Sequence, residues 1–273
     1  MPAMLTLNRF RALRVAVLTL PVMFVASAGC DIAMADHKEK ETSEWRKTYE
    51  LQPGGRVEIG NVNGKIEVVA GEGNTVEIVA MKISHGVSRE AAKEALSRIE
   101  ITEDVTAAAV RIETKMQRST GGLFGGGGLQ VDYTVRVPMT AEIKASTVNG
   151  GVEITGLGGK INAETTNGGI KVRDVTGSVD ASTTNGGVDV DLAKLSDSGV
   201  KLECTNGGIK LRLPSDSKAS ISARITNGGI ETNGLTLDPA SEQSKRRLDA
   251  RLNGGGARID IEGTNGGIRI SSR

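Results

Sequence analysis

The chain has 273 residues, which is enough for one large domain or two small ones. Apolar residues make up 38% of it, aromatic residues only 2%, and glycine occupies 36 positions, so a thin interior of Val, Ile and Ala fits better than a thick globular core. The formal net charge is +1, which excludes the strongly basic surface of a nucleic-acid-binding protein, and we expect no nucleic acid partner.

The first segment has the order of an export signal. An apolar run over residues 15–25 is too short to span a bilayer, and positive charge precedes it. That charge comes from Arg9, Arg11 and Arg14. We therefore predict a signal peptide over residues 1–29 and an exported protein of the cell envelope, either periplasmic and lipid-anchored or on the cell surface.

Two cleavage routes fit this signal. Ala28-Gly29-Cys30 resembles a bacterial lipobox, in which Cys30 is the candidate lipidation site, although Ser27 stands where the usual Leu would be. Ordinary signal peptidase would instead cut after residues 26–28 or 33–35, where small residues have the required spacing. On either route a membrane is a partner only through a lipid anchor.

The next two segments are predicted to lead into a repeat array. Residues 30–49 are polar and of mixed charge, which indicates a tether. Residues 50–140 contain an early strand–corner–strand unit around Asn63, further strands, and a short helix after Ser88, a suitable N-cap. We interpret this region as an N-terminal rung with a capping subdomain, since a stack of strands needs an end that stops edge-to-edge pairing.

Residues 141–273 repeat one unit. Corners that begin with Asn recur at spacings of 18, 18, 21, 21 and 38 residues, and the flanking residues alternate between apolar and polar on both sides of each corner. This period-2 pattern predicts strands with one buried and one exposed face. The predicted structural corners are Asn63, Asn149, Asn167, Asn185, Asn206, Asn227 and Asn265.

The repeats predict an all-β fold: a β-solenoid, similar to a parallel β-helix, with rungs of about 18–21 residues, Asn-Gly-Gly corners, and the N-terminal capping subdomain with its one short helix. A chain of β-hairpins is the alternative, because Asn-Gly is also a strong hairpin signal. Repetition of the corner favours the solenoid, in which each corner lies on the next and the Asn amides can form a ladder. We expect Gly168→Val to destabilise the fold, on the ground that this corner needs a positive φ.

No catalytic, metal or cofactor site follows from the sequence. The Gly-rich stretch 121–128 lacks the Lys-Ser/Thr of a phosphate loop, and the corners lack the Asp spacing of calcium-binding repeats. His37 and His85 are expected to be solvated, and Cys204 to be a small buried residue. An enzyme that acts on polysaccharides is the alternative function, since such enzymes use charged clusters on β-helices. The candidate cluster is Lys171, Arg173, Asp189, Asp191 and Lys210.

The repeated Thr-Asn-Gly-Gly-Ile units, the signal segment, the helix ahead of the repeats and the closing Gly-Thr-Asn-Gly-Gly-Ile-Arg-Ile resemble the bacterial "putative adhesin" β-strand-repeat family, of exported or lipoprotein type. The resemblance covers residues 50–273 and implies a domain of unknown function with no catalytic motif. It implies a non-catalytic adhesin or scaffold that presents a polar solenoid face to a surface, matrix or envelope ligand.

Overall fold

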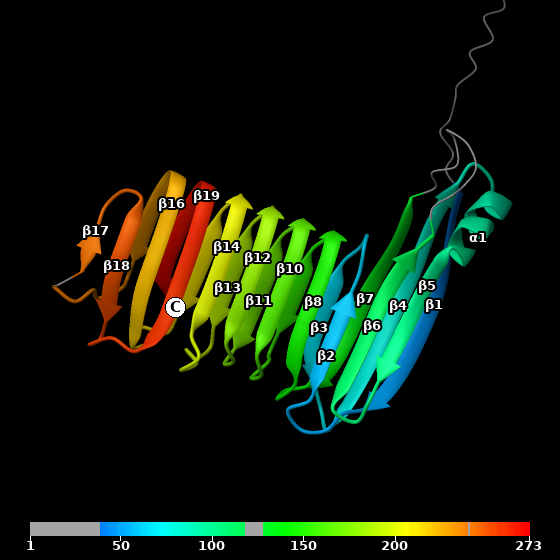
Figure 1. Ribbon diagram of the computed structural model, residues 1–273, viewed down its shortest axis with the longest axis horizontal. Helices are drawn as coiled ribbons and strands as arrows, with labels where there is room; N and C mark the ends of the chain where they lie inside the picture. Colours follow the sequence, from blue (N-terminus) through cyan, green and yellow to red (C-terminus); the bar gives the residue numbers. More distant parts are fainter. Residues whose placement is uncertain (1–38, 118–127, 240) are drawn as a thin grey trace, which may run out of the picture. The chain divides into compact units, whose positions relative to one another are not determined.

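The computed structural model describes residues 39–117, 128–239 and 241–273 (Figure 1). These residues form 19 strands in one continuous sheet and one helix, so the prediction of an almost all-β chain is confirmed. The predicted signal peptide, Cys30 and nearly all of the Gly-rich stretch 121–128 lie outside the described residues.

The strands are arranged in two ladders. The first ladder contains the strands that enter the corners, together with the strands that cap them at both ends. In spatial order its members are β5 (Ile99–Val105), β6 (Ala109–Met116), β2 (Arg56–Gly60), β8 (Glu142–Asn149), β10 (Ile161–Asn167), β12 (Val179–Asn185), β14 (Val200–Asn206), the first half of β19 (Ala257–Ser272), the first half of β16 (Ala219–Asn233), β18 (Arg247–Leu252) and β17 (Glu242–Gln243).

The second ladder contains the strands that leave the corners, together with the strands that close its N-terminal end. Its members in spatial order are β1 (Glu39–Glu50), β4 (Thr75–Gly86), β7 (Leu129–Pro138), β3 (Ile66–Gly71), β9 (Val152–Thr155), β11 (Ile170–Val175), β13 (Val188–Leu192), β15 (Ile209–Leu213) and the second halves of β19 and β16. The two ladders are one sheet because β16 and β19 run through their corners without a break.

Successive corner units pair in parallel and in register. Asn167 pairs with Asn149 on one side and with Asn185 on the other, and Ile161 likewise pairs with Ile143 and Val179. A chain of hairpins would have antiparallel pairs at these corners, so that alternative is wrong for the part of the chain that the structure describes. Antiparallel pairs among the described strands lie at the two ends of the ladders.

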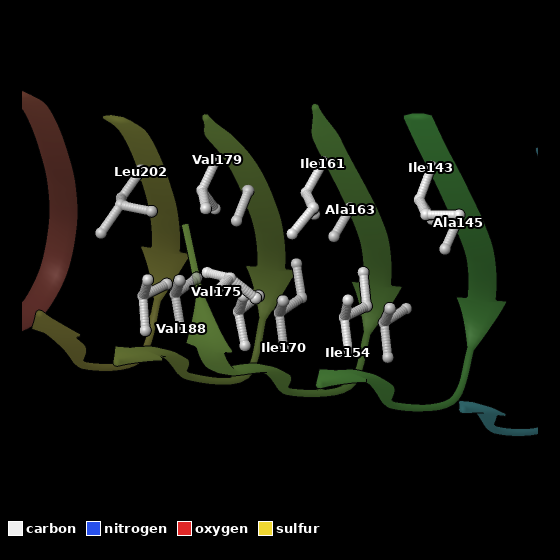
Figure 2. Packing of buried hydrophobic residues seen from close by; sticks show 14 of the residues in the cluster. Ile143, Ala145, Ile154, Ile161, Ala163, Ile170, Val175, Val179, Val188 and Leu202 are labelled. Carbon is white, nitrogen blue, oxygen red and sulfur yellow. The ribbon is translucent and has the colours of Figure 1, made fainter. Parts of the chain in front are cut away.

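The core lies between the two ladders (Figure 2). Ile161 and Ala163 of β10 point from the first ladder towards Ile154 and Ile170 of the second, and all four side chains are fully buried. Ile143, Ala145, Val179 and Leu202 continue one row, and Val188 continues the other. Burial of each Val, Ile or Leu contributes about 1.5–3 kcal/mol, and repetition of these small rows replaces a single thick core.

The N-terminal end is closed by antiparallel strands and the helix. β4 pairs with β7 and β1 pairs with β4, while β5 pairs with β6. The helix α1 (Arg89–Ser97) begins where the sequence predicts, because the Ser88 hydroxyl accepts a hydrogen bond from the Ala91 backbone N–H at 3.2 Å.

The predicted tether over residues 30–49 is wrong from Glu39 onwards, because Glu39–Glu50 is the edge strand β1. Among its side chains Trp45 and Tyr49 pack partly buried against the core, and most other positions are exposed and polar. The sequence therefore shows no apolar alternation here. Charged side chains along this strand are the usual protection of an edge against pairing with other chains.

The C-terminal end does not follow chain order. β19, the last strand, lies between β14 and β16 in the first ladder, with Asn265 paired to both Asn206 and Asn227. β18 then pairs antiparallel with β16. Strand β18 is Arg247–Leu252, and it caps this end of the ladder.

Candidate functional site

The corner asparagines form a continuous amide ladder. Every Nδ2 except that of the terminal Asn63 donates to the Oδ1 of its neighbour at 2.7–2.9 Å. The order in space is Asn63, Asn149, Asn167, Asn185, Asn206, Asn265 and Asn227. Each inner amide both donates and accepts along the row, an arrangement that requires identical residues at an identical position in every rung.

Behind this ladder, buried hydroxyls satisfy the carbonyl groups of the corners. Thr165 Oγ1 donates to Gly150 O and Thr183 Oγ1 donates to Gly168 O, both at 2.9 Å. In the next rung the free thiol Cys204 occupies the same position, with its Sγ 3.2 Å from Gly186 O. Cys204 is buried, as expected, and burial raises the pKa of its thiol, so this residue is a packing residue.

The first glycine of each corner is required by close backbone approach. A Cβ on Gly168 would lie 1.9 Å from Gly150 O, and one on Gly186, whose φ is +149°, would lie 2.0 Å from Gly168 O. Gly168 itself has no positive φ, so the reason given above for Gly168→Val is wrong at that position. The corner excludes a side chain there because the next rung fills the space.

The outer face of the second ladder carries ion pairs. The predicted charged cluster lies together here, and Arg173 binds both carboxylate oxygens of Asp189 at 2.7 and 2.8 Å. Arg212 donates to Asp191 at 3.0 Å. The hydrogen bond from Arg173 lowers the pKa of Asp189. A general acid for glycoside cleavage needs a raised pKa, so Asp189 does not fit that role.

The outer face of the first ladder is hollowed at several places. A small hollow of about 210 Å³ near its N-terminal end is lined by Arg56, Glu142 and Lys144. Another, of about 220 Å³, lies towards the C-terminal end, where β14 meets β19. A further hollow, of about 640 Å³, lies over β16, β18 and β19 at the C-terminal cap, and we call it the cap cleft. Its lining residues are Ser220, Ile221, Ser222, Asp238, Ser241, Glu242, Arg247, Asp249, Ala250, Arg251, Arg258 and Asp260.

No pattern in the sequence predicts the cap cleft. The cleft forms because β19 pairs with one edge of β16 and β18 pairs with the other edge of β16. Neither pairing follows from the spacing of the repeats. Within the described ranges no group of three or more His, Cys, Asp or Glu side chains is placed to hold a metal ion. His85 lies in β4 opposite Lys40, and His37 lies outside the described residues.

A protein-family model described as Toastrack DUF4097 matches residues 102–271. The chain belongs to the Toastrack DUF4097 family. The resemblance inferred from the repeats, to a β-strand-repeat family of unknown function, is thereby confirmed. Comparison of this Toastrack chain with curated proteins gives no match.

Solved structures similar to this Toastrack chain are distant. A putative cell adhesion protein from Clostridium sporogenes ATCC 15579 is 14% identical, with a TM-score of 0.47 over 85% of this chain and 100% of its own. A putative adhesin from Bacteroides fragilis NCTC 9343 is 12% identical, with a TM-score of 0.39 over 85% and 97%. A putative lipid binding protein from Parabacteroides distasonis ATCC 8503 is 10% identical, with a TM-score of 0.20 over 84% and 96%. At these values no function passes from them to this chain.

Proposed function

We propose that the chain is a non-catalytic, exported module of the cell envelope that presents the polar outer faces of a β-solenoid to a surface, matrix or envelope ligand, as an adhesin or scaffold. The rungs of 18–21 residues turn at Asn-Gly-Gly corners, and each rung places its outward side chains beside those of the next. The observation that carries this proposal is the unbroken parallel register, for example Lys171 beside Asp189 and Asp189 beside Lys210.

Such rows favour binding over catalysis. Side chains at fixed strand spacing, about 4.8 Å, present donors and acceptors at a constant repeat, which suits an extended partner. The alternative, a carbohydrate-active enzyme, needs two carboxyl groups in different protonation states. The charged cluster of the second ladder pairs its Asp189 and Asp191 with arginines instead, and that pairing is typical of a structural ion network.

The proposed localisation in the cell envelope rests on the signal segment over residues 1–29 and on the candidate lipidation site Cys30. In the part of the chain that the structure describes, no helix has the length and apolar character needed to cross a bilayer. A lipid on Cys30 would supply the attachment, with the repeat array held outside the cytoplasm.

Protease shaving of intact cells, followed by blotting for the repeat array, tests this proposal. Loss of the band on whole cells supports an adhesin at the cell surface. Protection that ends only when the envelope is broken supports a periplasmic scaffold instead, and a band that fractionates with cytoplasmic markers overturns the proposal. Cys30→Ser should move the protein from the membrane fraction to the soluble fraction, and Cys204→Ser is the matched control.

A further inference from the structure

The cap cleft has a floor made of small side chains between longer ones. Ser220 and Ser222 of β16 lie between Arg258 and Asp260 of β19 on one side and strand β18 on the other. Ser222 pairs across the ladder with Asp249, and its hydroxyl donates to Asp249 Oδ1 at 3.0 Å. Serine is much shorter than its neighbours, so the surface is hollow along β16.

Asp238, Ser241 and Glu242, which precede β18, line one side of the cleft and are hydrogen-bonded to or paired with β18. The Asp238 backbone N–H donates to Arg251 O at 2.9 Å, and the Arg251 N–H donates to Ser241 Oγ at 3.3 Å. Glu242 in β17 pairs with Asp249 in β18. The wall of the cleft is therefore part of the hydrogen-bonded fold and is preorganised for a ligand.

The charges in the cap cleft are nearly balanced. Arg258 Nε lies 2.6 Å from Asp260 Oδ2, and Arg247 Nε lies 2.5 Å from Asp249 Oδ2. Arg251 adds a third cation, and Asp238 and Glu242 add two more carboxyl groups at the rim. This mixture favours neither a polyanion nor a polycation. Guanidinium groups donate and carboxylates accept, and a sugar hydroxyl does both.

The cap cleft continues onto the neighbouring strands. The hollow of about 220 Å³ beside β14 shares Ser222, Arg258 and Asp260 with it, and adds Lys201 and Glu203. The combined groove crosses β14, β19, β16 and β18, which at about 4.8 Å between strands is roughly 14 Å from the first to the last. A groove of this length and polarity matches an extended chain better than a compact ligand.

We propose that this groove binds a neutral, hydroxyl-rich glycan chain, lying over Ser220 and Ser222 and hydrogen-bonded by the Arg and Asp side chains of β18 and β19. The proposal rests on the proposed binding function and assigns it a ligand class. None of the residues that line the cap cleft is aromatic, so each site binds weakly and depends on repetition along a polymer or on many copies of the protein.

The test uses the full mature chain, labelled with ¹⁵N, and follows amide shifts while a linear neutral glucose oligomer, cellohexaose, is added. Oligogalacturonate and an oligomer of glucosamine serve as the acidic and basic probes.

Three variants accompany these titrations. Ser220→Tyr fills the floor of the cleft. Ser178→Tyr is its matched control, since Ser178 lies at the same place in its rung, seven residues before the corner Asn, and is likewise half-buried. Arg251→Gln removes one guanidinium group and its charge without adding bulk.

The expected result is a set of shifts confined to β16, β18 and the β14–β19 side of the groove, with binding weakened at least tenfold by Ser220→Tyr and by Arg251→Gln and unchanged by Ser178→Tyr. The inference is overturned if cellohexaose shifts no groove residue, if equal shifts occur on the second ladder, or if only a charged probe binds. Protease shaving of cells tests the proposed function independently of glycan binding. If the repeat array is exposed at the cell surface but does not bind cellohexaose, the glycan proposal is wrong and the proposed surface function still stands.

Discussion

At the scale of single residues, the corners depend on which atoms of neighbouring rungs approach each other. Asn167 accepts a hydrogen bond from Asn185 and donates one to Asn149, while the adjoining Gly168 leaves room for the carbonyl of Gly150. Both residue types could be predicted from the sequence. The reason for Gly168 could not, because its backbone angle is ordinary and the restriction comes from another rung.

The glycine pair of one corner gives a sharp test. Gly168→Ala should destabilise the fold by about 1–3 kcal/mol, because its Cβ would lie 1.9 Å from Gly150 O. Gly169→Ala is the control, because its nearest contact, Gly187 O at 3.4 Å, is an ordinary one. Urea unfolding monitored by circular dichroism measures the difference, and equal unfolding midpoints for the two variants would contradict the close-approach explanation.

The ion pair of Asp189 predicts a dependence of stability on pH. Its pKa in the folded state lies below the usual 3.8, so its contribution is complete above that value and is lost as the pH falls through the lower, folded-state pKa. Asp189→Asn should therefore lose less unfolding free energy than the wild type between about pH 5 and about pH 3. The same slope in Asp189→Asn and in the wild type would reject the assignment.

At the scale of elements, β19 is the strand on which the C-terminal end depends. It pairs with β14 and β15 on one side and with β16 on the other, and it buries Ile259, Ile261, Ile268 and Ile270. Among the described strands β16 has no other parallel neighbour, and β18 is joined to the ladders only by antiparallel pairing with β16 and β17. Without β19 they lose their place in the ladder.

Truncation after Gly256 should therefore release β16 and β18 as well as remove β19. Amide hydrogen exchange is expected to show loss of protection over residues 219–252 while residues 56–60 and 142–172 remain protected. Protection of β16 in the truncated chain would show that it can stack directly on β14, and would contradict the dependence on β19.

At the scale of the whole molecule, an array with parallel register should tolerate removal of a complete rung. Deletion of residues 168–185 joins Asn167 to Gly186 and recreates a corner, because the two asparagines are 18 residues apart. We expect a folded protein of lower stability, since each rung contacts mainly its neighbours. Deletion of residues 168–176 removes half a rung and should prevent folding. Thermal unfolding followed by circular dichroism distinguishes the two, and similar transitions in both variants would contradict the rung assignment.

The sequence by itself determined the local structure: the buried alternation of Ile161, Ala163 and Thr165, the helix after Ser88 and the buried position of Cys204. These follow from residue spacing and backbone preference. Only the tertiary structure decided which rung lies beside which. The Asn-Gly-Gly sequence is the same at Asn206, Asn227 and Asn265, so it does not show that Asn265 pairs with both of the others. The tertiary structure also decided that the polar segment Glu39–Glu50 is a strand, since an edge is specified by its neighbour's unpaired backbone groups. The cap cleft forms where these tertiary pairings bring β16, β18 and β19 together. For that reason the sequence predicts the repeated strands of the protein but not this candidate binding site.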